Sequence, residues 1–388
     1  MPALDVFIKC VNPCLNNLIT NLSEYYRTMN LKEKIIPAMV LLFLAPATGE
    51  LLSGSSPPLE FFNPFSLLLL VLLYGCGAIL AREAVFRWKK GWLSMLVLGA
   101  AYGIAEEGLA CKSFFDPGWM DIGNLGSYSR WAGINWMWSL ELTVFHAVIS
   151  ISVPIIIVTL LFPRNKNDPW VSRRGLWLSG AGFLFIIIFC YFLISSYRPP
   201  APQYIAAIGT AAALVFCAWK LPQPFPWQRL FSRGSHHNKL PSVRWFTAFG
   251  VLWTFGLFFF SWVAVWFGPA PVIGILMISY FCITGLTLAW RSGWGTAWDE
   301  RHQAGMAAGV FGFLIFLAPL LEFGAGFWPN KNAGMTAAAV AFLLLLVWLN
   351  RRVNDRTIKD LANGISLAPY PTLDIASATS ERRNRPPS

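Results

Sequence analysis

The chain has 388 residues, of which 56% are hydrophobic and only 13% are charged. A soluble globular domain has roughly a quarter of its residues charged, so a water-soluble fold would expose far too much apolar surface and is excluded. The apolar residues form continuous runs of about 20, the length at which a helix crosses the ~30 Å hydrocarbon core of a bilayer. Because these runs do not alternate with polar residues, a membrane-spanning β-barrel is excluded too. The composition predicts an all-α, polytopic bundle of transmembrane helices.

The formal net charge of +11 could suggest a nucleic-acid partner. A basic surface that faces anionic lipid headgroups explains the same charge, so we expect the lipid bilayer as partner and no nucleic acid. The sequence has no phosphate-binding loop, dinucleotide fingerprint or haem-attachment motif. We therefore expect no cofactor.

Ten apolar runs predict ten membrane-spanning helices. In chain order they cover 35–53, 65–86, 92–111, 132–162, 175–195, 204–220, 245–267, 271–290, 305–327 and 333–350. Pro and Gly residues mark the breaks between runs, as expected for loops. The chain then divides into a cytoplasmic N-terminal segment (1–34), spans 1 to 4 with the intramembrane polar residues (35–162), spans 5 to 10 (163–350) and a disordered, basic C-terminal tail (351–388).

The distribution of Lys and Arg predicts the orientation of the spans. Basic residues collect in the cytoplasmic loops of membrane proteins. If the N-terminus is cytoplasmic, the loops on the opposite side hold only Lys112, Arg130, Arg198 and Lys331. We therefore expect a multi-pass protein of the cell membrane with both termini in the cytoplasm.

Ionisable residues inside the spans are the strongest functional signal, because each costs ~2.5–3.5 kcal/mol on insertion scales. They occur in spans 1 to 4 and in span 9. They are Glu50, Arg82, Glu83, Glu106, Glu107, Glu141, His146 and Glu322. In the predicted orientation all of them except Arg82 and Glu83 lie in the outer leaflet. The sequence thus predicts an acid-rich polar site there.

Adjacent glutamates on a helix point ~100° apart, so Glu106 and Glu107 can face one cavity. Two close carboxylates cannot both ionise cheaply, and one of them could hold a proton near neutral pH and act as a general base on water. We take Glu106, Glu107 and His146 as candidate catalytic residues. Candidate binding residues are Glu50, Lys112, Glu141 and Glu322. A single intramembrane His is a poor basis for zinc binding, so we expect no metal.

With its Glu106-Glu107 pair followed by His146 on the next span, the segment from Tyr102 to about Pro163 resembles the glutamic intramembrane proteases of the CAAX-processing and bacteriocin-processing family, and more distantly PrsW-like proteins. The resemblance covers about 60 residues. It implies a water that is activated by one glutamate for peptide hydrolysis, with His146 as one of the family's histidines.

The chain departs from the family pattern at three places. The family has Arg five residues after the first Glu, where this chain has Cys111, and PrsW-like proteins have Lys at the place of Ala110. The second His is missing from the spans, because the later histidines fall in predicted cytoplasmic loops. These histidines are His236, His237 and His302.

Two other interpretations use the same residues. An acid-lined outer pocket could bind or transport a small cation, a proton-coupled solute or an amine-bearing lipid headgroup. Alternatively, the polar residues form interhelical hydrogen bonds that only fix the packing, which we expect for Arg82 and Glu83. The loop 112–131 is rich in aromatic residues, and we expect it to fold back over spans 3 and 4 as a lid or an interfacial segment.

Overall fold

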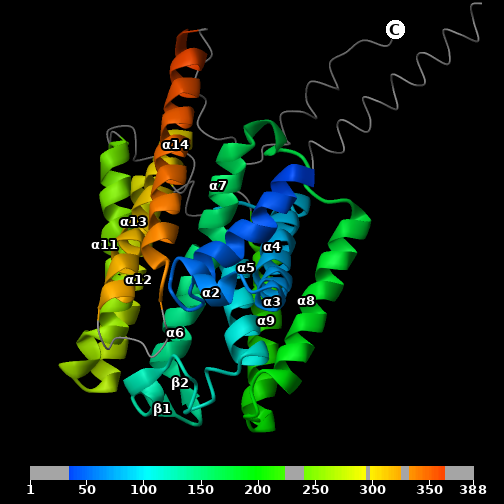
Figure 1. Cartoon of the computed structure of the whole chain (residues 1–388), viewed down its shortest axis with the longest axis vertical. Coiled ribbons are helices and arrows are strands. Elements are labelled where there is room, and N and C mark those ends of the chain that lie inside the picture. Colours follow the sequence, from blue (N-terminus) through cyan, green and yellow to red (C-terminus); the bar gives the residue numbers. More distant parts are fainter. Residues whose placement is uncertain (1–34, 223–239, 294–297, 325–331, 363–388) are drawn as a thin grey trace, which may run out of the picture.

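The structure is a computed structural model, and it describes residues 35–222, 240–293, 298–324 and 332–362. In this part of the chain almost all regular structure is helical. The exception is a hairpin of two short antiparallel strands, β1 (Arg130–Trp131) and β2 (Ile134–Asn135). The predicted fold class, an all-α bundle of many apolar helices, is confirmed (Figure 1).

Within the described residues, nine helices are long and apolar enough to cross a membrane. Several are built from consecutive segments: Pro64–Arg87 from α3 (Pro64–Leu70), η2 (Val71–Gly75) and α4 (Cys76–Arg87); Trp92–Ala110 from α5 (Trp92–Gly103) and η3 (Ile104–Ala110); and Trp136–Leu161 from α6 (Trp136–Phe145), η5 (His146–Ser152) and α7 (Val153–Leu161). The others are α8 (Arg173–Leu193), α9 (Ala201–Lys220), α11 with η8 (Val243–Trp266), α12 (Ala270–Arg291), α13 (Glu300–Phe323) and α14 (Met335–Ala362).

The first of the ten predicted spans is shorter than expected. It forms an apolar helix, Ile35–Leu51, whose last turn is η1 (Ala47–Leu51). Short helices also occur between the spans: α2 (Pro58–Phe61), η4 (Gly123–Gly126) and η6 (Pro163–Asn165). The predicted disordered tail 351–388 is wrong at its start, because α14 continues as a helix beyond residue 350 to Ala362. The predicted segment 1–34 and the rest of the tail, 363–388, lie outside the described residues.

Contacts at each end of the bundle join described segments that lie far apart in the chain. At one end, Arg356 at the end of α14 donates to the carbonyl of Leu160 at 2.9 Å and pairs with Glu300 at the start of α13 at 3.2 Å. At the other end, the hydroxyl of Tyr128 donates to the carbonyl of Gly268 at 2.8 Å. Segments predicted on one side of the membrane therefore meet each other.

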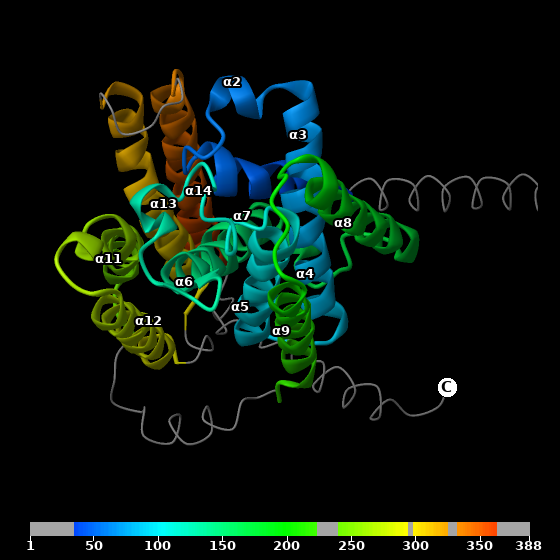
Figure 2. The same cartoon turned by 90° about the horizontal axis from the view of Figure 1, so that it is seen from below.

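The helix Trp136–Leu161 forms the centre of the bundle. In its most apolar stretch of 18 residues, 83% is buried inside the protein. The helices α8, α9 and α12 lie at the periphery of the bundle (Figure 2). Only 11–17% of their most apolar 18-residue stretches is buried inside the protein. A polar residue on the central helix is therefore shielded from lipid by neighbouring helices. Glu141 and His146 are such residues.

A saturated ionic network holds the end of the bundle where α4 finishes. Glu83 is fully buried and pairs with Arg82 at 2.6 Å and with Arg87 at 2.9 Å. It also accepts from the backbone N–H of Trp170 at 2.8 Å, and Arg82 donates to the carbonyl of Asp168 at 2.7 Å. Every group in this network has a partner, so the packing role predicted for Arg82 and Glu83 agrees with the geometry.

Candidate functional site

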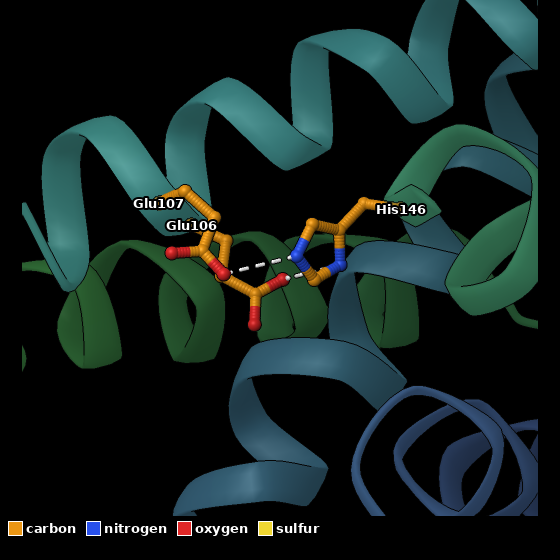
Figure 3. Close-up of side chains that lie close together, drawn as sticks. All are labelled: Glu106, Glu107 and His146. Carbon is orange, nitrogen blue, oxygen red and sulfur yellow. Dashed lines mark hydrogen bonds and ion pairs between the residues drawn. The ribbon is translucent and has the colours of Figure 1, made fainter. Parts of the chain in front are cut away.

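The imidazole of His146 faces two neighbouring carboxylates, those of Glu106 and Glu107, which approach it from the same side (Figure 3). Its Nδ1 is 3.2 Å from Oε2 of Glu106, and its Nε2 is 3.1 Å from Oε1 of Glu107. The exposed fractions of His146, Glu106 and Glu107 are 1%, 2% and 9%. The structure thus brings together the three residues that the sequence indicated as catalytic candidates.

Four π-helical segments of the described chain converge on this group. Glu50 lies on η1, Tyr74 on η2, the two adjacent glutamates on η3 and His146 at the start of η5. In a π-turn the hydrogen bond spans five residues, as in the bond from the N–H of Cys111 to the carbonyl of Glu106 at 2.8 Å. Such turns are rare in proteins, and those that occur are often found at functional sites. Hydropathy and residue spacing do not reveal them.

Hydrogen bonds orient the carboxylate of Glu107. The hydroxyl of Ser113 donates to its Oε2, and Nε1 of Trp138 donates to the Ser113 oxygen at 3.0 Å. On the other side of the imidazole, Ser150 Oγ lies 2.9 Å from Nδ1 of His146. The carboxylate and the ring are therefore held in one relative orientation.

Glu50 comes close to the same group from the first helix. Its carboxylate accepts from the hydroxyl of Tyr74 and, at 2.8 Å, from that of Ser56. The rings of Tyr74 and Tyr102 pack against the imidazole, with centroids 5.9 Å and 5.8 Å from that of His146. The hydroxyl of Tyr102 is buried and has no hydrogen-bond partner among the described residues.

A pocket opens beside this cluster. Its volume is about 80 Å³. One water molecule needs ~10–15 Å³ by the same measure, so the pocket has room for several waters. It is lined by Gly49, Glu50, Ser53, Gly54, Ser55, Tyr74, Glu107, Asp121, Trp138, Glu141, Leu142, Phe145, His146, Phe258, Trp262 and Asn332. Among the described residues, the lining has four carboxylates and no Lys or Arg, so a cation or a small polar molecule suits it.

The loop between η3 and α6 closes part of this pocket. Phe114 and Phe115 of the loop are buried against the ends of the neighbouring helices, and Asp121 lines the pocket. The pKa of Asp121 is raised to about 7, first by burial and then by the charges of Glu50 and Glu107. The loop thus contributes to the pocket wall, and its role as a lid or as an interfacial segment stays a prediction.

Two of the predicted binding residues lie elsewhere. Lys112 is fully buried, and its Nζ donates to the backbone carbonyls of Tyr191 and Ser195, both at 2.7 Å. Glu322 accepts from the backbone N–H groups of Gly334 and Thr336 at the start of α14. Both side chains satisfy backbone groups at helix ends, so neither lines the pocket.

Other residues at the site were not predicted from the sequence. They are Tyr74, Ser113, Asp121, Trp262 and Asn332. Residues of these types are common in loops and near membrane interfaces, and no spacing distinguishes these from the rest. Of the intramembrane ionisable residues that the sequence indicated, only Glu322 lies in spans 5 to 10, but α11 of this half contributes aromatic residues to the pocket wall.

A metal ion is sterically conceivable at the cluster. One ligand atom from each of Glu106, Glu107 and His146 lies within 4.8 Å of the others. In the described geometry Nε2 of His146 lies 3.1 Å from Glu107 and Nδ1 lies 2.9 Å from Oγ of Ser150, so a metal ion would have to replace one of these contacts. The expectation of no metal site stays a prediction.

The fold and this buried cluster define a polytopic helical membrane protein with an intramembrane polar site. Residues 39–237, a little more than half of the chain, match the model of a family described as an uncharacterized membrane protein family, and the chain belongs to that family. The matched region includes the cluster and excludes α11 and Asn332. No curated protein and no solved structure matches the chain. The resemblance to glutamic intramembrane proteases therefore stays a prediction.

Proposed function

We propose that this protein is a membrane-embedded hydrolase in which Glu107 and His146 activate a water molecule. The observation that supports the proposal is a buried imidazole in contact with two carboxylates, beside a pocket with room for water. Glu107 and His146 line the pocket, whereas Glu106 does not. We therefore assign the reaction to Glu107 and His146 and a positioning role to Glu106.

The hydrogen bonds of the imidazole fit a neutral ring. A neutral imidazole donates a hydrogen bond from one nitrogen and accepts one at the other. Nε2 of His146 lies 3.1 Å from Oε1 of Glu107, and Nδ1 lies 2.9 Å from Oγ of Ser150, so Nε2 can donate to the carboxylate while Nδ1 accepts from the hydroxyl. The pocket wall then presents a proton acceptor, Glu107, next to a hydrogen-bond donor, His146, which is what activation of water requires.

In the proposed reaction, the oxygen of water attacks a carbonyl carbon of a membrane peptide or lipid while the Glu107 carboxylate accepts the proton of that water. His146 donates a hydrogen bond to the carbonyl oxygen as it becomes negative. The bond from the carbonyl carbon to the leaving nitrogen or oxygen then breaks, and the leaving atom takes the proton from Glu107. One water is consumed, and a carboxylic acid and an amine or alcohol are formed.

The test works without an identified substrate. Membranes that contain the wild type or Glu107→Gln at equal amounts are incubated in ¹⁸O-labelled water, and peptides and lipids are analysed by mass spectrometry. We expect new carboxylic acids with one ¹⁸O in the wild type only, because removal of a general base typically costs about 10²–10⁴ in rate. Glu322→Gln, which lies outside the pocket, should behave as the wild type.

Two outcomes contradict the proposal. If Glu107→Gln yields the same labelled products as the wild type, the assignment of Glu107 is wrong. If no labelled product appears while Glu107→Gln is degraded or melts far below the wild type, the cluster has a packing role.

Transport of a small cation is the second candidate function. It is favoured by the four carboxylates and the absence of Lys and Arg in the described pocket lining. Cation- or pH-dependent uptake into vesicles that contain the wild type, lost in Glu107→Gln without any labelled hydrolysis product, would favour transport over hydrolysis.

A further inference from the structure

Two buried acceptor atoms of the pocket residues accept no hydrogen bond of ordinary geometry from the described residues, although the hydroxyl of Ser261, itself without such a bond, lies near the Glu141 carboxyl. They are Oε2 of Glu141 and Oδ1 of Asn332, in side chains that are 2% and 7% exposed. Nδ2 of Asn332 donates to the carbonyl of Leu321 at 2.9 Å, which fixes Oδ1 as the remaining acceptor. An unpaired buried acceptor costs ~1–3 kcal/mol. A ligand with hydrogen-bond donor groups would satisfy both oxygen atoms.

The charges of the pocket point to a positive ligand. Glu50 and Glu107 already accept hydrogen bonds from hydroxyl groups or from His146. The structure shows no cationic partner for Glu141 or Asp121 within the described residues. A buried carboxylate without a counter-charge is costly, and a bound cation removes that cost.

Aromatic rings form the rest of the wall. Trp138, Phe145, Phe258 and Trp262 all line the pocket, and the rings of the last two are packed with centroids 4.9 Å apart. A cation within about 6 Å of an aromatic face gains ~0.5–2 kcal/mol. Organic ammonium groups use this interaction, whereas a small inorganic ion prefers to keep its water.

We infer that the pocket binds a protonated primary amine, with N–H groups donated to Glu141 and Asn332 and the positive charge held against the aromatic wall. A quaternary ammonium would satisfy the rings and leave both acceptors unpaired, because it has no N–H group. The ligand is either a small free amine or the amine of a lipid headgroup. Binding of the amine does not depend on the proposed hydrolysis. Only the statement that the amine is the recognised part of the substrate rests on the proposed function.

Selectivity of the wild type tests the inference without any variant. The full-length protein in phosphatidylcholine nanodiscs is titrated at pH 8 with ethylammonium, tetramethylammonium and 1-propanol, and heat release and tryptophan fluorescence are followed. A ligand of this size can reach a Kd on the order of 1 mM. We expect ethylammonium to bind about tenfold more tightly than the other two. Equal affinity for tetramethylammonium, or no saturable binding of ethylammonium, would overturn the inference.

Variants locate the site. Glu141→Gln should weaken ethylammonium binding about tenfold or more, because a hydrogen bond to a charged group is lost. Glu300→Gln makes the same chemical change at the opposite end of the bundle, where Glu300 pairs with Arg356, and should have no effect. If Glu300→Gln and Glu141→Gln weaken binding equally, the amine binds elsewhere.

Two further arms identify the source of the amine and separate this inference from the proposed function. Phosphatidylethanolamine in the nanodisc should compete with ethylammonium if the headgroup is the ligand, and should leave its affinity unchanged if the ligand is a free amine. The wild type in the same nanodiscs is also assayed for ¹⁸O incorporation, so that binding and hydrolysis are measured on one sample. Binding without hydrolysis would refute the hydrolase and keep the amine site, whereas hydrolysis without amine selectivity would do the reverse.

Discussion

Nε2 of His146 lies 3.1 Å from Oε1 of Glu107, although 39 positions separate the two residues in the chain. The contact joins η5 of the central helix to η3 of its neighbour, and both residues are buried. Glu106 contacts the other ring nitrogen from the same side. A change to either member of the pair therefore alters the environment of the other.

This coupling predicts non-additive effects on the proposed hydrolysis. His146→Gln and Glu107→Gln should each lower product formation by about 10²–10⁴. The double variant should be no worse than the more damaging single variant, because groups that act as a unit lose their contribution together. Initial rates of ¹⁸O incorporation provide the measurement. If the two effects multiply, the residues act independently and the assignment of a pair is wrong.

The sequence predicted the depth of the polar residues better than their partners. Counting turns from the predicted span ends placed Glu50, Glu107, Glu141 and His146 in one layer, and all four line one pocket. Equal depth in the membrane does not show which helices are neighbours, however. Glu322 also lies near a predicted outer end, but its carboxylate caps the start of α14.

The remaining features depend on packing that the sequence does not show. Glu50, Glu107 and His146 lie on π-helical segments, and hydropathy has no signal for the extra residue in such a turn. Lys112 follows the acidic pair closely in the chain, but its side chain turns to backbone carbonyls at the end of α8. The contribution of Trp262 and Phe258 requires the position of α11 relative to α6, which is a tertiary property.

The ionic network around Glu83 predicts a large effect on stability and none on the site. Glu83→Ala leaves Arg82 buried without its carboxylate partner, and breaking a buried pair costs about 3–5 kcal/mol. We expect a markedly lower melting temperature in detergent. Glu60→Ala, at an exposed position, should melt as the wild type does. A normal melting temperature for Glu83→Ala would show that the network contributes little.

Close approach of α11 and α13 predicts a second packing effect. A Cβ atom at Gly309 would collide with the carbonyl oxygen of Thr247, and one at Gly250 would lie 2.7 Å from the backbone nitrogen of Val310. Small residues allow such approach between membrane helices. Gly309→Ala should therefore destabilise the protein by about 1–3 kcal/mol. A Cβ at Gly285 on α12 would meet no described atom within 4 Å, so Gly285→Ala should be neutral, and equal losses would contradict this packing.

Asp121 predicts a pH-dependent difference in stability. Burial raises its pKa from 3.8 to about 7, and the nearby carboxylates of Glu50 and Glu107 contribute to this rise. Between pH 4 and 7 the folded state thus binds more protons at this residue than the unfolded state, and its contribution to stability falls as the pH rises. Asp121→Asn should melt higher than the wild type at pH 8, and this difference should be clearly smaller at pH 5. An equal difference at both pH values would show that Asp121 does not titrate in this range.

The orientation of the protein predicts which residues a membrane-impermeant thiol reagent reaches in intact cells. Met120 is 77% exposed on the loop that closes the pocket, and Arg174 is exposed at the opposite end of the bundle, at the start of α8. Because basic residues gather at the α8 end, that end should face the cytoplasm. In a cysteine-free background, Met120→Cys should react in intact cells and Arg174→Cys only after permeabilisation. The reverse pattern would invert the topology and open the pocket to the cytoplasm, so candidate amines would then have to be cytoplasmic.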